Sequence, residues 1–232
     1  MAARAATSVT VCTGIMHTKI EAVLWDFGGV ITSSPFDAFN RFESERGFPE
    51  NTIRRINAAN PDGNAWALFE RAEIDVTQFD ALFATEAAVL GHDIRGAEVL
   101  ALLSGDIRPA MVAALDFCKR AGLKIGCITN NVQTGHGTGM AGSTEKAVAI
   151  AAIMALFDAV IESSKAGVRK PDPRIYQMMC DILSVSPQNC VYLDDLGINC
   201  KPAAALGMTA IKVENERQAL DALSQIIGIS FT

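Results

Sequence analysis

Seven side chains able to do polar chemistry stand at the ends of four apolar runs in the sequence. They comprise three carboxylates, two amides, one hydroxyl and one amine: Asp26, Thr129, Asn130, Lys170, Asp194, Asp195 and Asn199. Singly, none is a strong signal, since an Asp after a strand is more often a helix cap and a Lys-Pro pair is usually a loop. Their order, each after an apolar run, predicts one shared reaction centre. An adjacent pair of carboxylates concentrates negative charge and suits a hard cation with oxygen ligands.

Such a centre requires parallel strands whose carboxyl ends meet at one edge. Apolar runs bounded by turn residues predict strands at Ile20–Trp25, Lys124–Thr129, Ala159–Glu162, Val191–Leu193 and Thr209–Val213. Helical spacing predicts helices at Ala110–Ala121, Thr144–Ala155, Pro173–Leu183, Lys201–Leu206 and Glu216–Ile226. This alternation is typical of a Rossmann-like, doubly wound parallel α/β sheet, which binds ligands beyond the carboxyl ends of its strands.

The segment between the first two strands has a different pattern. Aromatic and aliphatic residues recur there at helical spacing, with turns at Gly47-Phe48-Pro49 and Asn60-Pro61-Asp62-Gly63, and about four helices are expected. We therefore expect a helical cap domain over residues 35–103, inserted after the first strand. Residues 19–34 and 104–232 would form the α/β core. Residues 1–18 are interpreted as a disordered N-terminal extension, with a transit peptide as the alternative.

The four segments resemble the four motifs of the haloacid dehalogenase superfamily. The segments DFGGVI, KPDPRIY and LDDLGIN are similar to the motifs of the branch that includes the phosphatase-like N-terminal domain of soluble epoxide hydrolase. The motifs span residues 26–199. The resemblance implies a Mg²⁺-dependent hydrolase acting on a small phosphomonoester.

The resemblance also implies a role for each residue. Asp26 is expected to attack phosphorus and form an aspartyl-phosphate, while Thr129 and Asn130 hold the phosphoryl oxygens and Lys170 supplies positive charge. The expected Mg²⁺ ligands are Asp26, the backbone carbonyl of Gly28, and Asp195. Asp194 and Asn199 are expected to support this site.

Gly28 departs from the family pattern. Its phosphatases usually have a second Asp two residues after the nucleophile, which serves as general acid and base. General acid–base help is typically worth about 10²–10⁴-fold in rate, so we expect slow turnover. The glycine still has a carbonyl, so the cation site is expected to remain.

Two alternatives stay open. Dehalogenases of the superfamily also lack the second Asp, which favours a 2-haloacid dehalogenase-like hydrolase, but they do not normally carry the acidic pair at Asp194-Asp195. A catalytically weak binding or regulatory protein on the same fold would also tolerate Gly28. In the glycine-rich stretch 130–144, Asn131 or His136 could touch substrate, and His136 could replace the missing acid.

Composition argues against a nucleic-acid-binding protein and a membrane-spanning protein. A net charge of −6 gives no basic footprint for nucleic acid. The sequence has no apolar run of the roughly 18 residues that a transmembrane helix needs. The six cysteines show no C-x-x-C pair, which favours reduced core residues and a cytoplasmic protein. The sequence does not indicate an oligomeric state.

Overall fold

The computed structural model describes residues 19–132 and 143–231. The predicted N-terminal extension and His136 lie outside these residues. The described strands are β1 (Ala22–Trp25), β2 (Lys124–Thr129), β3 (Ala159–Glu162), β4 (Cys190–Asp194) and β5 (Thr209–Lys212). They form one sheet in the order β3-β2-β1-β4-β5, with every neighbouring pair parallel. This confirms the predicted doubly wound parallel sheet.

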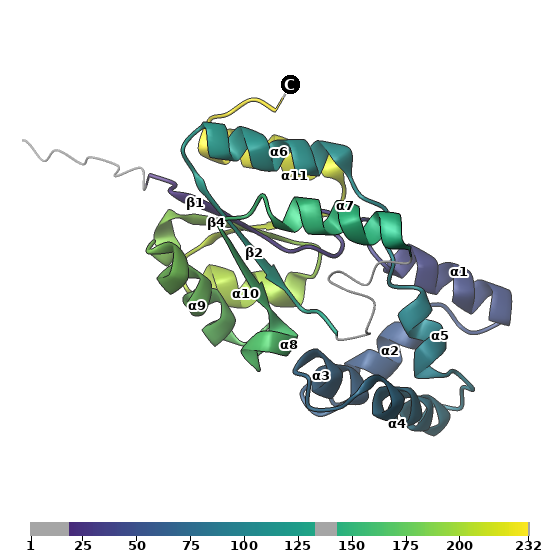
Figure 1. Ribbon diagram of the computed structural model, residues 1–232. Coiled ribbons are helices and arrows are strands. Elements are labelled where there is room, and N and C mark those ends of the chain that lie inside the picture. The colour runs from purple at the N-terminus through teal and green to yellow at the C-terminus, as the bar shows by residue number, and fades with distance from the viewer. Residues whose placement is uncertain (1–18, 133–142, 232) are drawn as a thin grey trace, which may run out of the picture.

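Helices cover both faces of the sheet (Figure 1). The helices that follow β1 are α1 (Phe36–Arg46), α2 (Thr52–Ala58), α3 (Ala65–Glu70), α4 (Val76–Val89), α5 (Gly96–Ala101) and α6 (Pro109–Arg120). The later ones are α7 (Thr144–Met154), α8 (Ser163–Ala166), α9 (Pro173–Leu183), a 3₁₀ turn at Pro187–Asn189, α10 (Gly197–Ala205) and α11 (Glu216–Ile227).

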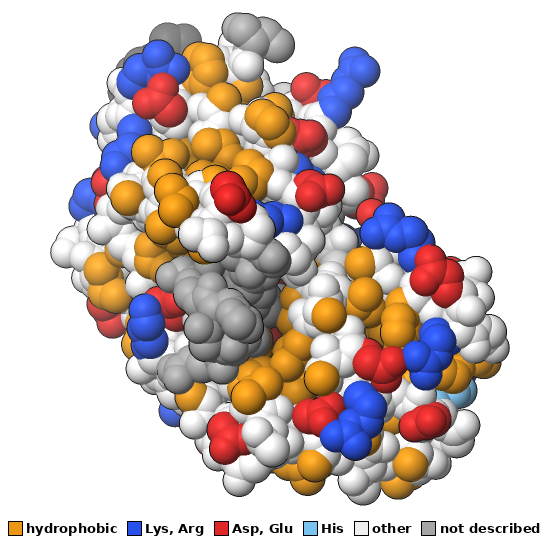
Figure 2. Space-filling model, turned by 45° about the vertical axis from the view of Figure 1, so that its right-hand side comes forward, with side chains coloured by type: hydrophobic (Ala, Val, Ile, Leu, Met, Phe, Trp, Pro, Cys, Tyr) orange, Lys and Arg blue, Asp and Glu red, His pale blue; other side chains and the backbone are white. Residues whose placement is uncertain are grey.

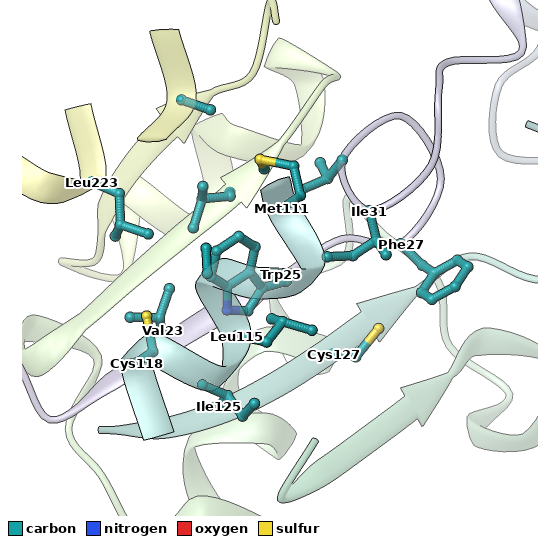
Figure 3. Packing of buried hydrophobic residues seen from close by; sticks show 14 of the residues in the cluster. Val23, Trp25, Phe27, Ile31, Met111, Leu115, Cys118, Ile125, Cys127 and Leu223 are labelled. Atoms are coloured by element: carbon teal, nitrogen blue, oxygen red, sulfur yellow. The ribbon is translucent and has the colours of Figure 1, made fainter. Parts of the chain in front are cut away.

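Alternation along the buried strands builds a core on each face. Val23 and Trp25 of β1 pack with Met111 and Leu115 of α6 and with Leu223 of α11 (Figure 3). The side chains in between point to the other face, where Leu24 joins residues of α9 and α10. Because both faces are covered at the centre of the sheet, the central strand β1 is buried and apolar throughout rather than alternating in polarity. Packing on both faces therefore fixes the carboxyl end of this strand.

Helices α1–α5, which we call the helical insert, have a hydrophobic core of their own. Phe39, Ile56, Phe69, Phe79 and Phe83 are buried together there, and Val132 after β2 packs against them. In Figure 1 the insert lies beside the carboxyl ends of β1 and β2. The predicted division into domains stays a prediction. On the face that Figure 2 shows, acidic and basic side chains are interspersed.

Several predicted boundaries were wrong. Helix α10 begins at Gly197, four residues before the predicted start, and contains Pro202. Because Pro favours the first turn of a helix, Pro202 favoured a predicted start that was too late in the sequence. The insert has five helices rather than about four, and the short helix α8 was not predicted. Strand β4 extends to Asp194, so this carboxylate ends the strand instead of following it.

Candidate active site

Asp26 is held at the carboxyl end of the central strand β1. Its N–H continues the strand pairing by donating to the carbonyl of Leu193 at 2.8 Å. Its Oδ1 accepts the N–H of Phe27 at 2.6 Å, and the turn after the strand is closed by the N–H of Ile31, which donates to the Phe27 carbonyl at 2.9 Å. The side chain is nearly buried. The backbone therefore fixes the Asp26 carboxylate at the edge of the sheet.

Lys170 brings a buried positive charge to this carboxylate. Its Nζ lies 2.7 Å from Asp26 Oδ1 and 2.8 Å from Asp194 Oδ2, and the side chain is 1% exposed. Burial alone would lower the pKa of Lys170, but Asp194 and Asp26 outweigh that effect and raise it, so the ammonium form is favoured. Burial raises the pKa of Asp26, with Lys170 opposing. Buried charges persist when they are paired in this way.

The start of α9 fixes the chain that leaves Lys170. Asp172 caps the helix by accepting the N–H of Arg174 at 2.9 Å, and Pro173 occupies the first turn. Both residue types favour these positions because they suit the unpaired N–H groups of a helix start. The cap and the proline at the start of α9 therefore set where the KPDP segment turns.

Asp194 is completely buried and saturated with hydrogen bonds. Besides Lys170 it accepts the N–H of Leu196 at 2.8 Å, the Tyr192 hydroxyl, and Nδ2 of Asn199 at 3.1 Å to each carboxylate oxygen. Asn199 was expected to support the site. In the structure its link to Lys170 runs through Asp194.

Asp195 is half-buried and completes an acidic cluster. One ligand atom each of Asp26, Asp194 and Asp195 lies within 4.8 Å of the others. Burial, together with Asp194, raises the pKa of Asp195 to about 6. Ser34 Oγ donates to Asp195 Oδ2 at 2.9 Å. One lysine does not balance three carboxylates, so this donor set fits a divalent cation with oxygen ligands.

The two glycines after Phe27 have different surroundings. A Cβ on Gly29 would lie 2.1 Å from Asp195 Oδ2, and its φ of +78° is in the left-handed region, so only glycine suits this position. A Cβ on Gly28 would meet nothing within 4 Å. A side chain at position 28 therefore has room for its Cβ, unlike one at position 29.

Thr129 and Asn130 lie at the end of β2. Thr129 is buried and lines the same cavity as Asp26 and Lys170. The Asn130 amide bonds both backbone groups of Lys170: Oδ1 accepts its N–H at 2.9 Å, and Nδ2 donates to its carbonyl at 3.0 Å. The side chain of Asn131 is bonded to Glu162 and Ser164, although it also lines the cavity.

The cavity has a volume of about 900 Å³ and lies between the sheet edge and the helical insert. Its floor contains Asp26, Gly28, Thr129, Lys170 and Asp195. Residues of the insert provide the opposite wall, which combines aromatic side chains with polar and charged ones: Phe36, Phe39, Trp66, Arg54, Asn57 and Glu70. The predicted site residues are thus brought together beneath this wall from the ends of β1, β2 and β4, from the loop that follows α8 and from the start of α10.

Three residues at the site were not predicted from the sequence. Glu70, of the insert, accepts hydrogen bonds from Arg169 and Asn130, and Ser34 bonds Asp195. Arg169 directly precedes Lys170, and this adjacency was the one signal in the sequence. Glu70 and Ser34 act through contacts with residues more than 50 positions away, which residue spacing does not reveal.

Comparison with known proteins identifies the family. The family model for haloacid dehalogenase-like hydrolases matches residues 20–207. Phosphatase MT3486 from Mycobacterium tuberculosis (strain CDC 1551 / Oshkosh) is 33% identical over 217 residues, covering 88% of this chain and 91% of its own length. Mouse acyl-CoA dehydrogenase family member 10 is 30% identical over 89% of this chain, which spans only 19% of that protein.

Two further likenesses concern the branch and the fold. Mouse bifunctional epoxide hydrolase 2 is 44% identical over 75 residues, which are 32% of this chain and 14% of that protein. Among solved structures, a haloacid dehalogenase family enzyme from Bacteroides thetaiotaomicron, in complex with magnesium and inorganic phosphate, shares the fold. Its TM-score is 0.55 at 17% identity, over 84% of this chain and 94% of its own.

No helix in the described part of the chain has the length and apolar character to span a bilayer. The family match covers most of the chain, the fold agrees with it, and the motif residues meet in one cavity. The chain belongs to the haloacid dehalogenase-like hydrolases.

Proposed function

We propose that the chain is a Mg²⁺-dependent phosphatase that hydrolyses a small phosphomonoester through an aspartyl-phosphate on Asp26. The observation that carries the proposal is the buried Lys170 ammonium, 2.7 Å from Asp26, at the floor of a cavity that also holds Asp195. An anionic nucleophile and an anionic substrate must approach each other here, so neutralisation is the main requirement. A phosphatase is also among the relatives similar over most of this chain.

The proposed reaction has two displacements. A carboxylate oxygen of Asp26 attacks phosphorus, and the bond from phosphorus to the alcohol oxygen breaks. The alkoxide leaves with the electron pair and takes a proton from water, because Gly28 offers no acid. Water then attacks phosphorus, its proton passes to solvent, and the bond to Asp26 breaks to release inorganic phosphate.

Lys170 and Thr129 are the residues that we assign to the phosphoryl group. The ammonium of Lys170 offsets charge on Asp26 and on the phosphoryl oxygens in both steps. Thr129 would hold a phosphoryl oxygen. Asn130 contributes to substrate binding through Lys170, since its amide is bonded to the backbone of that residue.

Asp26, Asp195 and the carbonyl of Gly28 would hold Mg²⁺. The ion would neutralise charge between the carboxylates and the phosphoryl group. The support is the set of three carboxylates within 4.8 Å, served by one lysine. Asp194 would stay a supporting residue, because its oxygens are already bonded to four protein groups.

The cavity exceeds the size of a phosphate, so the alcohol part of the substrate would lie within it. Phe36, Phe39, Trp66 and Leu103 offer an apolar surface, and the Arg54 guanidinium lies 3.7 Å from the centre of the Phe36 ring. Ligand sites combine such a surface with a few placed polar groups. We propose an alcohol with an apolar part.

A 2-haloacid dehalogenase is the second candidate, favoured by Gly28. In that reaction Asp26 would attack carbon and displace halide. The acidic cluster argues against it, because Asp195 beside the nucleophile repels the attacking carboxylate unless a cation lies between them.

A cytoplasmic location is proposed as well. The cysteines of the described residues are free and buried, which suits a reducing compartment. The proposed partner is a small phosphorylated substrate rather than nucleic acid or membrane.

The function is tested with a panel of phosphomonoesters, with and without Mg²⁺, alongside a 2-haloacid. The wild type is compared with Asp26→Asn. We expect Mg²⁺-dependent phosphate release from the wild type alone. Metal-independent halide release, or equal phosphate release by Asp26→Asn, would contradict the proposal.

A further inference from the structure

Glu70 is the point at which the helical insert contacts the loops of the active site. It is the last residue of α3, and its side chain is 8% exposed. Its Oε2 accepts from Arg169 Nε at 2.6 Å and from Asn130 Nδ2 at 3.2 Å, and Oε1 accepts from Trp66 Nε1 at 3.0 Å. One buried carboxylate of the insert thus serves two residues of the α/β part.

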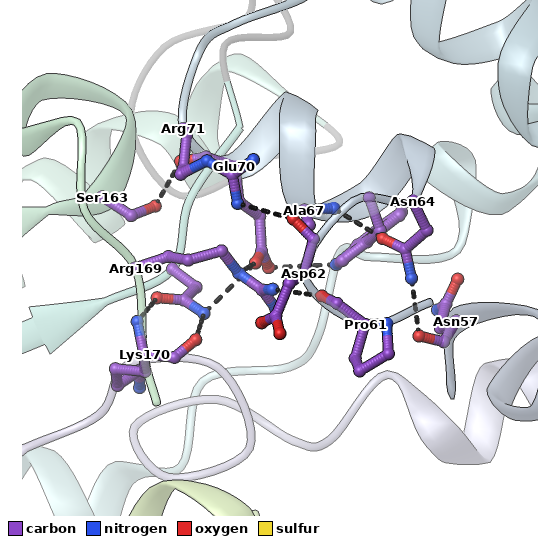
Figure 4. A network of polar contacts seen from close by, with 12 residues as sticks. Asn57, Pro61, Asp62, Asn64, Ala67, Glu70, Arg71, Ser163, Arg169 and Lys170 are labelled. Atoms are coloured by element: carbon purple, nitrogen blue, oxygen red, sulfur yellow. Dashed lines mark hydrogen bonds and ion pairs between the residues drawn. The ribbon is translucent and has the colours of Figure 1, made fainter. Parts of the chain in front are cut away.

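Both of those residues adjoin Lys170. Asn130 holds the N–H and the carbonyl of Lys170 with its two amide atoms, and Arg169 precedes Lys170 in the chain. Arg169 also donates from Nη1 to the carbonyl of Pro61 at 3.0 Å, so the insert holds this guanidinium at two places (Figure 4). Arg169 and Asn130 therefore connect the position of the insert to the backbone of Lys170.

The orientation of the Asn130 amide depends on this arrangement. Nδ2 faces two acceptors, Glu70 Oε2 and the Lys170 carbonyl, while Oδ1 faces the Lys170 N–H. The reversed amide would place an oxygen against the Glu70 carboxylate, so Glu70 favours the orientation that holds Lys170.

A second link passes through the backbone of Glu70. Its carbonyl accepts the Ser163 hydroxyl at 2.7 Å (Figure 4), and Ser163 Oγ accepts the N–H of Asn131 at 3.1 Å. The loops that follow β2 and β3 are therefore tied to the same residue of the insert.

We propose that Glu70 is a positioning residue, which holds Lys170 against Asp26 through Asn130 and Arg169 and so couples docking of the helical insert to the catalytic step. The catalytic part of this inference rests on the proposed phosphatase function. Glu70 does not itself touch the reacting groups. Glu70 lies in the cavity wall, but its loss leaves the apolar surface that would bind the alcohol, so the loss lowers kcat through a displaced lysine rather than weakening binding.

The test compares Glu70→Ala and Glu70→Gln with a control of the same kind, Glu43→Gln. Glu43 is also a buried carboxylate of the insert, but it accepts the N–H groups of Asn51 and Ile53 within the insert itself, at 2.7 and 2.8 Å. The control reports the cost of losing a buried charge in the insert, without contact with Asn130 or Arg169.

Two readouts are needed. Hydrogen exchange of the Lys170 amide directly reports the contact between Asn130 and the Lys170 backbone, because this N–H donates to Asn130 Oδ1. We expect exchange about tenfold faster in Glu70→Ala and no change in Glu43→Gln. The change in Glu70→Gln should be smaller than in Glu70→Ala, because glutamine keeps an acceptor for Asn130.

The second readout is hydrolysis of p-nitrophenyl phosphate with Mg²⁺. In Glu70→Ala, kcat should fall about 10–100-fold, the scale of the loss that a catalytic group displaced by roughly 1 Å causes, while KM changes little.

The outcomes distinguish the positioning role of Glu70 from the proposed phosphatase function. Equal Lys170 exchange in Glu70→Ala and Glu43→Gln overturns the positioning role, whatever the activity. Should Glu70→Ala fail to fold, Glu70→Gln decides: exchange and kcat both equal to those of Glu43→Gln overturn the proposal. A wild type that hydrolyses no phosphomonoester, with faster Lys170 exchange in the Glu70 variants, refutes the phosphatase function and leaves the structural coupling in place.

Discussion

Lys170 Nζ lies 2.7 Å from Asp26 Oδ1, and both side chains are withdrawn from solvent. This contact joins the end of β1 to a loop 144 residues further along the chain. It gives an otherwise buried carboxylate a cation, and it places that cation where a phosphoryl group would meet Asp26.

Replacing Lys170 with Met should abolish turnover. The variant leaves Asp26 and Asp194 buried without their cation, so we expect kcat for p-nitrophenyl phosphate to fall at least about 10²–10³-fold. The metal-free variant should also unfold at a lower temperature, because a buried charge has lost its partner. Lys165→Met is the matched control, since the Lys165 side chain pairs with a carboxylate, that of Glu162, but is itself largely exposed. Activity within tenfold of the wild type in Lys170→Met would contradict the assignment.

Adding a carboxylate at position 28 should speed the reaction. Gly28 has open space where a Cβ would stand, so Gly28→Asp can fold and can supply the missing acid and base. The expected gain in kcat is up to about 10²–10⁴-fold. Gly28→Ala controls for the backbone, and Gly29→Ala should lose activity because its Cβ collides with Asp195. A Gly28→Asp variant no faster than Gly28→Ala would show that proton transfer does not limit the rate.

Asp195 should set the magnesium requirement. Removing its charge in Asp195→Asn should raise the Mg²⁺ concentration for half-maximal activity by about tenfold or more. The measurement is a MgCl₂ titration of phosphate release after treatment with a chelator. Asp172→Asn, on the neighbouring loop and bonded to Arg174, serves as the control. An unchanged titration curve in Asp195→Asn would exclude this residue as a ligand.

Stability should depend on pH through Glu70. Burial raises the pKa of this carboxyl above its ordinary 4.5, with Arg169 opposing, so the folded protein holds the proton more tightly than the unfolded chain. Unfolding then releases a proton, and stability falls as the pH rises above about 4.5 through the folded pKa. The free energy of unfolding of the wild type minus that of Glu70→Gln should therefore decrease over this range.

Glu73→Gln provides a control of opposite sign for the same measurement. Its hydrogen bond to Arg71 lowers the pKa of Glu73, so the stability that this group contributes is lost as the pH falls. Urea unfolding of the three proteins between about pH 4 and 7 measures both effects. A difference between wild type and Glu70→Gln that rises with pH would contradict the burial argument.

The sheet and its reactive edge could be predicted because their causes are local in the sequence. Strands β2 and β3 have their predicted bounds, since both are short, mainly apolar runs bounded by turn or loop residues. Asp26, Thr129 and Asp194 could be found because strand ends of a parallel sheet meet at one edge.

The contacts between the insert and the sheet could not be predicted. Glu70 ends a helix whose sequence, AWALFE, gives no sign that its carboxylate reaches Asn130 and Arg169. Gly28 and Gly29 are adjacent and chemically identical, yet the position of Asp195 and the backbone conformation show that glycine is required at position 29 and not at position 28. Such differences arise from tertiary packing.

The most direct test of the account is a search for a phosphoryl group on Asp26. The protein is mixed with p-nitrophenyl phosphate and Mg²⁺, quenched in acid and examined by intact mass and peptide mass spectrometry. We predict a phosphorylated, hydroxylamine-sensitive Asp26 in the wild type, accumulating because Gly28 leaves its hydrolysis slow, and none in Asp26→Asn. Phosphate release with no phospho-enzyme in either protein, even at short times, or a phosphoryl group elsewhere in the chain, would contradict it.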